Sequence, residues 1–485
     1  MHLRNPALFR AEAFIDGVWV QADTGAAFAV TNPADGLVLG HVPDMGLAET
    51  RRAIAAAEAA WPAWRGRTAK DRSRLLKRWF DLIEANRDDL AMLITAEQGK
   101  PLAEALGEVS YGAAFVEWFA EEAKRVYGDV IPTPSVGRRI LALKEPIGVC
   151  AAITPWNFPI AMITRKAAAA LAAGCTMVVK PSELTPYSAL ALAALAQEAG
   201  MPAGVLNVIT GLDAPAIGAE LCAHPAVRKI TFTGSTEVGR VLLRQSAETI
   251  TKCTMELGGN APVIVFDDAD LDLAVKGALA AKFRNAGQAC IAANRILVQA
   301  GVYDRFAEAF TTAAAALTVG RGDAPDMMIG PLIEESAVAK VQAHLDDALA
   351  RGGRVTLGGK RHALGGSFFE PTVITQASPD MLLFREETFG PLAALFRFET
   401  ELEAVAMAND SEFGLASYVF TRDLARAITV SEALRYGMVG VNEGLISTEV
   451  APFGGVKQSG LGREGSRYGI EEYLEIKYVC LGGLG

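Results

Sequence analysis

The sequence predicts an α/β protein with two doubly wound parallel-sheet domains and a small additional β element. From residue 146 onward, short apolar runs alternate with helical stretches, which is typical of parallel βαβ units. The alternation restarts near residue 261 and predicts a second sheet. At 485 residues the chain is too long for one ordinary core, so two or three domains are expected.

The elements before residue 146 are predicted to be mostly helical. A helical pair is expected at residues 47–60 and 68–97, bounded by Pro and Gly. Residues 127–146 mix alternating side chains with prolines, as an edge hairpin does. The C-terminal residues 471–482 alternate similarly, and we expect them to pair with that hairpin, within one subunit or between subunits.

The first α/β block consists of five expected strands separated by helices. In a doubly wound sheet, ligands bind at the carboxyl ends of such strands. The strands are expected at 147–154, 176–180, 204–210, 227–233 and 251–257, and the helices at 159–173, 186–200, 214–223 and after 234. The second block begins with a strand at 261–266 and continues through helices near 271–284 and 302–317 to strands at 370–375 and 437–442.

Composition indicates a cytoplasmic enzyme. Hydrophobic residues make up 51% and charged residues 21%, which excludes a disordered chain. The net charge of -10 argues against a nucleic-acid or anionic-membrane partner, since either requires a basic face. No apolar run is long enough to cross a bilayer, and residues 1–14 lack the apolar core of a signal peptide.

The cysteines and histidines predict no metal site. The six cysteines include no CxxC pair, which excludes a disulfide scaffold and a thiolate zinc site. The five histidines show neither HExxH nor HxxxH spacing. One thiol, Cys290 in GQACIAANR, lies among small and polar neighbours and is a candidate nucleophile. No histidine lies near a motif that would make it a papain-like partner for this thiol.

Two motifs at strand ends suggest a dinucleotide site. In FTGSTEVGR, Gly234 and Gly239 bracket a turn that frees backbone N–H groups for phosphate, although an ordinary strand-to-helix loop has the same appearance. In VVKPSE, Lys180 and Glu183 stand where a ribose would lie, although they also fit a solvated surface pair. Glu183 would accept from a ribose 2′-OH and repel a 2′-phosphate, which favours NAD over NADP.

Two further motifs suggest polar groups for carbonyl chemistry. Asn157 in TPWNFP lies in a turn fixed by two prolines, where its amide would stabilise an oxyanion or merely cap the turn. Glu256 in MELGGNAP ends a strand before two glycines and is either a general base with a raised pKa or an exposed strand-end residue. Neither motif decides between its alternatives alone.

Taken in order, seven motifs resemble the aldehyde dehydrogenase superfamily over essentially the whole chain, from residue 14 onward. They are TPWNFP, KPSE, FTGSTEVG, MELGGNAP, GQAC, EETFGPL (386–392) and PFGGVKQSGLGRE (452–464). The resemblance implies that Cys290 attacks an aldehyde, that Asn157 and the Cys290 backbone N–H hold the oxyanion, and that Glu256 activates water to hydrolyse the thioester. It implies NAD or NADP as coenzyme, bound by Thr154, Pro155, Trp156, Lys180, Ser182, Glu183, Gly234, Ser235, Val238, Gly239, Leu257, Glu387 and Phe389.

The resemblance also implies a domain division and an oligomer. Residues 1–123 and 144–258 would form the dinucleotide-binding domain, and residues 259–458 the catalytic domain. Residues 124–143 and 459–485 would form the oligomerisation element of a homodimer or homotetramer.

Three stretches resemble the succinate-semialdehyde dehydrogenase branch of this superfamily: residues 162–175, 282–290 and 442–480. Arg165, Arg284 and Ser447 match that branch's positions for the far carboxylate of the substrate, and guanidinium groups suit a carboxylate because they bind it with paired hydrogen bonds. The predicted substrate is therefore a small aldehyde carrying a carboxylate. The alternatives are glutarate semialdehyde, another or uncharged aldehyde, phosphate or structural roles for the two arginines, and a structural protein that has lost turnover.

One position departs from the branch. Its members often carry a second cysteine two residues after the nucleophile, where this chain has Ala292. A redox switch through such a local pair is therefore not expected.

Overall fold

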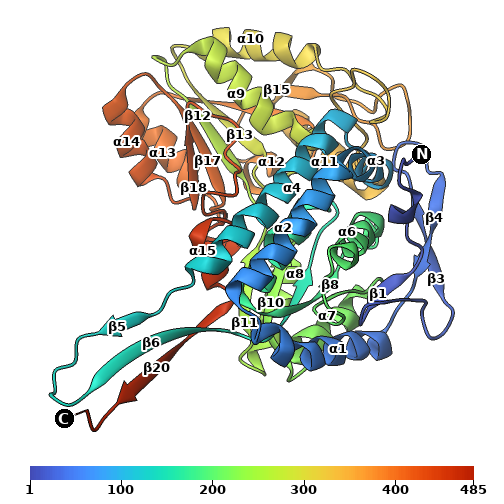
Figure 1. Ribbon diagram of the computed structural model, residues 1–485. Helices are drawn as coiled ribbons and strands as arrows, with labels where there is room; N and C mark the ends of the chain where they lie inside the picture. The colour runs from blue at the N-terminus through green and yellow to red at the C-terminus, as the bar shows by residue number, and fades with distance from the viewer. Residues whose placement is uncertain (485) are drawn as a thin grey trace.

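The computed structural model describes residues 1–484, and two large sheets lie at its centre (Figure 1). The first sheet has the strand order β19-β11-β10-β7-β8-β9-β1-β2. Its central strands β11, β10, β7, β8 and β9 are parallel, as predicted, while β19, β1 and β2 join antiparallel at the edges. The bounds are β1 Ala13–Ile15, β2 Val18–Val20, β7 Val149–Ile153, β8 Thr176–Lys180, β9 Leu206–Val208, β10 Val227–Thr233, β11 Lys252–Glu256 and β19 Gly460–Leu461.

The second sheet has the order β14-β15-β16-β13-β12-β17-β18. All neighbouring pairs are parallel except β14 and β15. Strands such as β12 and β17 are buried throughout, as expected where helices cover both faces of a parallel sheet. The bounds are β12 Ala261–Val265, β13 Ala293–Gln299, β14 Arg354–Leu357, β15 Thr372–Ala377, β16 Leu392–Phe398, β17 Ala416–Phe420 and β18 Met438–Val441. The predicted fold class is confirmed.

Helices cover both sheets, and the burial of α5 shows how closely they pack. Every residue of α5 is buried, because the helix lies beneath α4 and α2 and against the first sheet. Its alanine-rich sequence permits this close approach. The helices are α1 Leu47–Arg65, α2 Ala69–Ala85, α3 Arg87–Gln98, α4 Leu102–Glu122, α5 Ala161–Ala173, α6 Pro186–Glu198, α7 Ala214–Ala223, α8 Thr236–Ala247, α9 Leu271–Phe283, α10 Tyr303–Ala315, α11 Glu335–Ala350, α12 Leu382–Arg385, α13 Glu401–Asn409, α14 Leu424–Ala433 and α15 Ser466–Glu471. Short 3₁₀ turns are η1 Pro6–Leu8, η2 Ala123–Arg125, η3 Arg284–Gly287 and η4 Lys457–Ser459.

The helix expected over residues 68–97 is two helices. Asn86 leaves the helical conformation, with φ −105° and ψ 18°, and its side-chain amide donates to the Leu82 carbonyl at 2.9 Å. Asn86 therefore ends α2, and α3 starts at the next residue. A local side chain-to-backbone hydrogen bond of this kind competes with the helical ladder, and the periodicity of the apolar residues does not reveal it.

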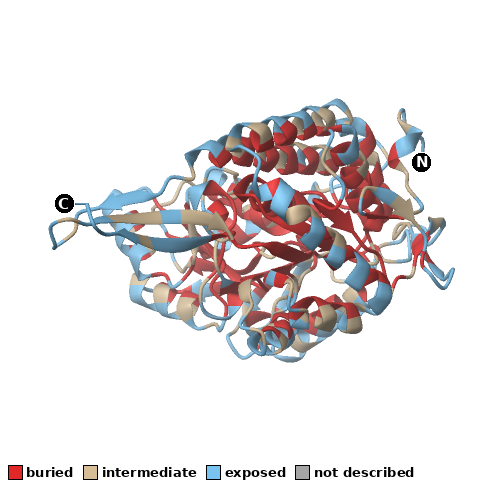
Figure 2. Cartoon of the chain, turned by 60° about the horizontal axis from the view of Figure 1, so that its bottom comes forward, coloured by how far each residue is buried: buried red, intermediate tan, exposed pale blue. Residues whose placement is uncertain are grey.

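A three-stranded sheet projects from the body of the molecule, and its residues are mostly exposed (Figures 1 and 2). It consists of β5 Asp129–Ile131, β6 Arg139–Pro146 and β20 Leu474–Leu481. The predicted pairing of the C-terminal strand with the hairpin is confirmed within one chain: β20 runs antiparallel to β6, from Leu474 opposite Pro146 to Leu481 opposite Arg139. A separate pair, β3 Ala27–Thr31 and β4 Val38–Pro43, lies near the N-terminus.

The residues just before β20 lie differently from the prediction. Residues 459–473 were expected in the oligomerisation element, but β19 pairs antiparallel with β11, with Gly460 opposite Glu256. The short helix α15 then packs on α4 and α5. The open edge of β11 provides unpaired backbone groups that β19 satisfies, so this stretch belongs to the first sheet. The remaining domain division stays a prediction.

The topology brings several loops to one place. In the first sheet, β8 and β9 lie on one side of β7, and β10 and β11 lie on its other side. The strand order therefore reverses between β7 and β10. Ligands bind at such switch points, beyond the carboxyl ends of the strands. Residues 154–157 and 234–235 follow these two strands. Within residues 1–484, none of the helices has the length and apolar character needed to span a bilayer.

Candidate active site

A cavity of about 430 Å³ lies at this edge of the first sheet, and loops of the second sheet's domain close its other side. Thr233 and Glu256 reach it from the ends of β10 and β11, whereas Cys290 reaches it from the turn before β13. The sequence-predicted residues that line it are Pro155, Trp156, Asn157, Gly234, Ser235, Glu256, Leu257, Cys290, Glu387 and Phe389. Thr154, Lys180, Ser182, Glu183, Val238 and Gly239 are not part of this lining.

Cys290 follows a strained turn. Asn285 and Ala286 have φ values of 52° and 54°, in the left-handed region that non-glycine residues rarely adopt, and Gly287 follows at 76°. At Gly287 a Cβ atom would lie 2.2 Å from the Gly390 carbonyl oxygen, so glycine is required there. The turn thus brings the thiol to the cavity wall. Such strain persists only where surrounding contacts hold it, and it is common at functional sites.

In the protein without coenzyme or substrate, the Cys290 thiol is protonated at neutral pH. Burial raises its pKa to about 12, while the Arg165 guanidinium opposes the shift. The thiolate is the nucleophilic form, so the thiol needs a base or an additional positive charge when it reacts.

The rate of Cys290 alkylation by iodoacetamide in the coenzyme-free protein is expected to rise about tenfold per pH unit between pH 7 and pH 10. Below the pKa of about 12, each pH unit increases the thiolate fraction tenfold. Peptide mass spectrometry measures the rate at Cys290 separately from the exposed Cys480. A rate that levels off below pH 9 would show that the thiolate is already stabilised in this state.

Asn157 presents its side-chain amide to the cavity in a fixed orientation. One N–H donates to the Gln288 carbonyl oxygen at 3.1 Å, two residues before Cys290. An amide NH₂ carries two donors, so one remains for a ligand. Asn157 is buried, and its Oδ1 atom has no hydrogen-bond partner among the described residues. One donor is thus held and one is free, which is what a site for an oxyanion requires.

Glu256 is almost fully buried, at 1% exposure, and neither carboxyl oxygen has a hydrogen-bond partner within residues 1–484. Burial raises its pKa well above the ordinary value, and the nearby Glu464 carboxylate adds to the shift. A buried carboxyl group of this kind takes up a proton readily near neutral pH. The position therefore suits a general base in a water-poor cavity.

Glu464 lies beside the candidate site, and the sequence reasoning did not single it out. Its carboxylate forms ion pairs with Arg165 and Lys166, two consecutive buried residues of α5. Burial would raise the pKa of Glu464, but Arg165 and Lys166 outweigh it and keep the pKa below its ordinary value. Glu464 lies in the motif PFGGVKQSGLGRE, but its partner Lys166 is 298 residues away in the sequence. Only the tertiary structure reveals the cluster.

The opposite part of the cavity fits a dinucleotide. Ser235 caps α8 by accepting from the Val238 N–H at 3.3 Å, so the positive end of the helix dipole opens beside Gly234. A Cβ on Gly239 would lie 2.5 Å from the Leu257 side chain, so glycine allows α8 to pack against that residue. The N-terminus of α8 at Gly234 and Ser235 is thus a cradle that suits a phosphate group.

Glu387 and Phe389 complete this side. Trp156 and Phe389 meet edge to face, with ring centroids 5.7 Å apart. Glu387 accepts from the Gly259 N–H at 2.9 Å, and burial raises its pKa to about 7. Lys180 and Glu183 form an ion pair at 3.0 Å, with Glu183 partly exposed. This pair matches both the ribose-binding and the surface-pair interpretation.

The three residues expected to hold a carboxylate surround Tyr111, which sequence analysis missed. Burial raises the pKa of Tyr111, and the neighbouring Arg165, Arg284 and Ser447 oppose the shift. Arg284 lies in an adjoining hollow of about 480 Å³, with its guanidinium 4.8 Å from the Phe158 ring centroid. It has no ion-pair partner within the described chain.

Arg165 already has an ion-pair partner within the protein. It is fully buried, pairs with Glu464 and lies 4.5 Å from the Phe453 ring centroid. Part of its charge therefore already compensates a carboxylate of the protein. Arg284 is the more independent cation for a substrate carboxylate.

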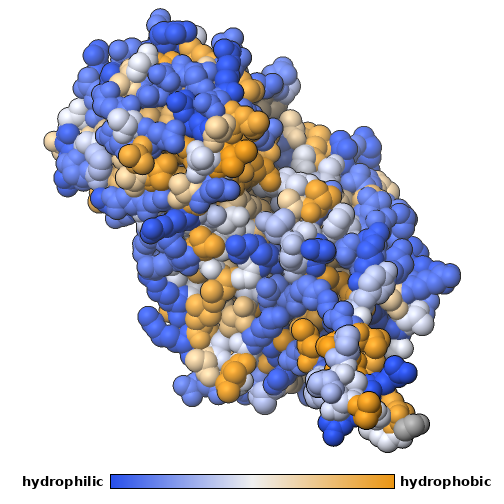
Figure 3. All heavy atoms as spheres, turned by 90° about the vertical axis from the view of Figure 1, so that its left-hand side faces the viewer, coloured by the Kyte–Doolittle hydropathy of each residue, from blue (hydrophilic) through white to orange (hydrophobic). Residues whose placement is uncertain are grey.

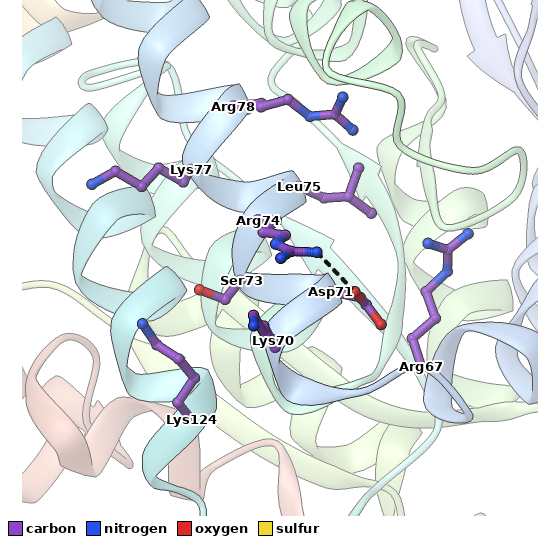
Figure 4. Close-up of a pocket in the computed structure, with 9 residues that line it drawn as sticks. All are labelled: Arg67, Lys70, Asp71, Ser73, Arg74, Leu75, Lys77, Arg78 and Lys124. Carbon is purple, nitrogen blue, oxygen red and sulfur yellow. Dashed lines mark ion pairs between the residues drawn. The ribbon is translucent and has the colours of Figure 1, made fainter.

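Another surface hollow, of about 760 Å³, is basic and lies elsewhere (Figure 4). Its cations are mainly on α2, where Lys77 and Arg78 point to opposite sides of the helix. Among the residues that the structure describes there, Arg74 pairs with Asp71 at 3.7 Å and Lys77 with Glu117 at 3.5 Å. The side chains diverge and do not converge on one point, as a ligand site requires.

Comparison with known proteins gives one consistent family. The model of the "Aldehyde dehydrogenase family" matches residues 19–479. The chain is 62% identical to a 3-sulfolactaldehyde dehydrogenase of Pseudomonas putida, over 100% of this chain and 99% of the relative, and 61% identical to a glutarate-semialdehyde dehydrogenase of Pseudomonas aeruginosa, over 100% of both. It is 61% identical to a succinate-semialdehyde dehydrogenase [NADP(+)] of Escherichia coli, over 99% of this chain and 100% of the relative. The crystal structure of a succinate-semialdehyde dehydrogenase from Burkholderia pseudomallei superposes with a TM-score of 0.99 at 61% identity, covering 99% of this chain and 100% of the other.

Proposed function

Because this chain belongs to the aldehyde dehydrogenase family, we propose that it oxidises succinate semialdehyde to succinate through a covalent intermediate on Cys290. The observation that carries the proposal is that Cys290, Asn157 and Glu256 face one cavity. The family uses NAD or NADP, and the cradle at Gly234 and Ser235 supports a dinucleotide in this chain.

The residues of the cavity divide the reaction between them. The Cys290 thiol gives its proton to water, the thiolate sulfur bonds to the aldehyde carbon, and the carbonyl oxygen becomes an oxyanion held by the free Asn157 N–H and the Cys290 backbone N–H. The coenzyme supplies the acceptor for the hydride that leaves this carbon. The product on Cys290 is a thioester, which remains reactive toward water. Glu256 takes a proton from that water, and succinate and the free thiol are released.

The substrate proposal rests on the cations beside this cavity. An aldehyde with an anionic tail would place the tail among Arg284, Ser447 and Tyr111, with Arg165 contributing part of its charge. Charge-assisted hydrogen bonds of this kind contribute roughly 1.5–3 kcal/mol each. Glutarate semialdehyde is the second candidate, since one methylene discriminates by only about 1–3 kcal/mol and a relative carries that name. The sulfolactaldehyde relative adds a sulfonate tail to the compounds worth testing.

Arg284→Ala is expected to raise KM for succinate semialdehyde more than about tenfold and to leave turnover of propanal nearly unchanged. Propanal has no charged tail, so it does not need the guanidinium. Arg165→Ala is expected to impair both substrates, because it also leaves Glu464 without one of its partners. Steady-state kinetics with both aldehydes checks this. An equal loss of kcat/KM for succinate semialdehyde and propanal in Arg284→Ala would show that Arg284 does not bind the substrate carboxylate.

One assay tests the proposed function directly. Reduction of the coenzyme is followed by absorbance with succinate semialdehyde, glutarate semialdehyde, sulfolactaldehyde and propanal, each with NAD and with NADP. The highest kcat/KM is expected for succinate semialdehyde. Glu183 favours NAD, because its carboxylate would repel a 2′-phosphate. Lys180 opposes that preference, because its ammonium would neutralise the charge of a 2′-phosphate. A clear preference for propanal would overturn the substrate proposal.

We also propose a homodimer or homotetramer formed through the projecting sheet, and a cytoplasmic location. Apolar side chains gather at that end of the molecule (Figure 3), among them Val130 at 72%, Ile476 at 74% and Tyr478 at 65% exposure. Exposed apolar patches mark interaction surfaces. All six cysteines are free thiols in the described chain, which suits a reducing compartment.

Ile476→Asp is expected to shift the protein toward the monomer, since a carboxylate on this surface would lose its hydration in an interface. Analytical ultracentrifugation over a range of concentrations measures the shift. Leu402→Asp, at a position that is 83% exposed on α13, serves as the control and is expected to leave assembly unchanged. An unchanged sedimentation coefficient in Ile476→Asp would place the interface elsewhere.

A further inference from the structure

A buried ion pair touches the loop that carries Asn157. Lys100 precedes α4, and Glu108 lies on its second turn; both side chains have 0% exposure. The Lys100 ammonium donates to the Glu108 carboxylate at 2.6 Å and to the Asn157 backbone carbonyl at 2.7 Å. It also lies 3.8 Å from the ring centroid of Phe158, the next residue of the loop. A single cation therefore holds the peptide group that follows the Asn157 side chain.

Glu108 holds the other end of the same loop. Its second carboxyl oxygen accepts from the backbone N–H groups of Ile160 at 2.9 Å and Ala161 at 3.3 Å, where α5 begins. The carboxylate thus bridges Lys100 to the first turn of α5. Residues 157–161 are fixed at both ends by one ion pair.

The same helix also holds the turn before the nucleophile. Glu104, one turn before Glu108 on α4, accepts from the Asn285 N–H at 2.8 Å. The Asn285 side chain then donates to the Asn157 carbonyl at 3.1 Å and to the Gln288 carbonyl at 3.2 Å. Asn285 has the strained φ of 52°. The start of α4 therefore contacts both halves of the cavity wall that meet at Asn157 and Cys290.

Stability alone does not account for a buried ion pair here. Removing two charges from water costs free energy that their attraction often does not recover, and well-packed apolar residues commonly serve as well or better. An apolar pair, however, makes no hydrogen bonds to the carbonyl of Asn157 or to the N–H groups of Ile160 and Ala161. What the ion pair adds is a defined orientation of this loop.

We propose that the Lys100–Glu108 ion pair is a positioning element that aims the Asn157 amide at the oxyanion. The inference rests on the proposed function, because it assumes that Asn157 stabilises the developing charge. An oxyanion donor acts only when it is held at hydrogen-bond distance in advance, and a misplacement of about 1 Å costs on the order of 100-fold in rate.

A double-mutant cycle tests the inference. Lys100→Met is expected to lower kcat about 10- to 100-fold, with the KM for coenzyme unchanged within about threefold. Asn157→Ala alone is expected to lower kcat about 100- to 1,000-fold. In the Asn157→Ala background, Lys100→Met is expected to cost less than about threefold, because the amide that the ion pair positions is absent. Urea unfolding of each variant records stability separately.

Arg72→Met is the matched control. Arg72 is a buried cation that donates to the Ala172 carbonyl at 3.1 Å, at the far end of α5 from the loop. Its kcat is expected to stay within about threefold of the wild type. If Lys100→Met does not fold, the cycle is run with Glu108→Gln, which retains an acceptor for Ile160.

The outcomes separate the two levels of the argument. Equal fold-losses from Lys100→Met with and without Asn157 would overturn the positioning role, as would an equal loss in Arg72→Met. An Asn157→Ala variant with wild-type kcat would instead overturn the oxyanion assignment in the proposed function. Coupling confined to Lys100 and Asn157 supports both.

Discussion

Cys290→Ala is expected to lower kcat for succinate semialdehyde by at least about 10⁴-fold. Cys290 is the thiol that lines the cavity shared by Asn157 and Glu256, so its removal leaves the aldehyde without a covalent partner. Removal of the Cys290 thiol is expected to leave coenzyme binding intact, because Gly234 and Ser235 lie on the other side of the cavity. Absorbance of the reduced coenzyme measures turnover, and fluorescence titration measures coenzyme affinity.

Cys222→Ala is the matched control for that variant. Cys222 is buried on α7 and does not line the cavity. Its kcat is expected to remain near the wild-type value. Coenzyme reduction at an undiminished rate in Cys290→Ala would refute the covalent mechanism.

Glu256→Gln is expected to lower steady-state kcat about 10²- to 10⁴-fold while preserving the first turnover. Formation of the thioester requires the thiol and the oxyanion donors, whereas its hydrolysis requires a base for water. Stopped-flow absorbance is therefore expected to show a burst of reduced coenzyme equal to the concentration of active sites, followed by a slow phase. Absence of the burst would mean that Glu256 acts before hydride transfer.

The pH dependence of the slow step follows from the environment of Glu256. Burial and Glu464 raise its pKa well above the ordinary value, so the carboxylate form increases as pH rises through that pKa. Hydrolysis of the thioester is expected to accelerate over the same range in the wild type and to lose this dependence in Glu256→Gln. Glu97→Gln is the control, since burial raises the pKa of Glu97 to about 8 outside the cavity. Its pH profile is expected to match the wild type.

The five parallel strands of the first sheet and β12, β15 and β18 of the second could be predicted because they are short apolar runs between Gly, Pro and polar residues. The limits of β10 at Val227 and Thr233 and of α7 at Ala214 and Ala223 coincide with the predicted ranges. The placement of residues 460–461 was wrong because pairing between strands far apart in the sequence determines it. Two residues, Gly460 and Leu461, make β19 only because the edge of β11 is open, and no local pattern announces that.

In the candidate site too, residues in local sequence motifs could be predicted, whereas contacts between distant segments could not. Asn157 and Glu256 could be placed at the cavity because one follows β7 and the other ends β11, at the edge where parallel sheets bind their ligands. Cys290 precedes β13 and was singled out by its small and polar neighbours. Lys100, Glu108 and Tyr111 were missed because burial of a charge or a hydroxyl depends on tertiary packing. Arg165 was predicted to bind the substrate carboxylate, and its ion pair with Glu464 could not be read from two motifs far apart in the sequence.

The position of β19 has a consequence for biosynthesis. The edge strand β11 ends at residue 256, yet the segment that completes its hydrogen bonding is at residues 460–461. A nascent chain on the ribosome therefore holds an unfinished sheet until residues 460–461 have emerged. Exposed strand edges invite association between chains, so aggregation competes with folding throughout this interval of translation.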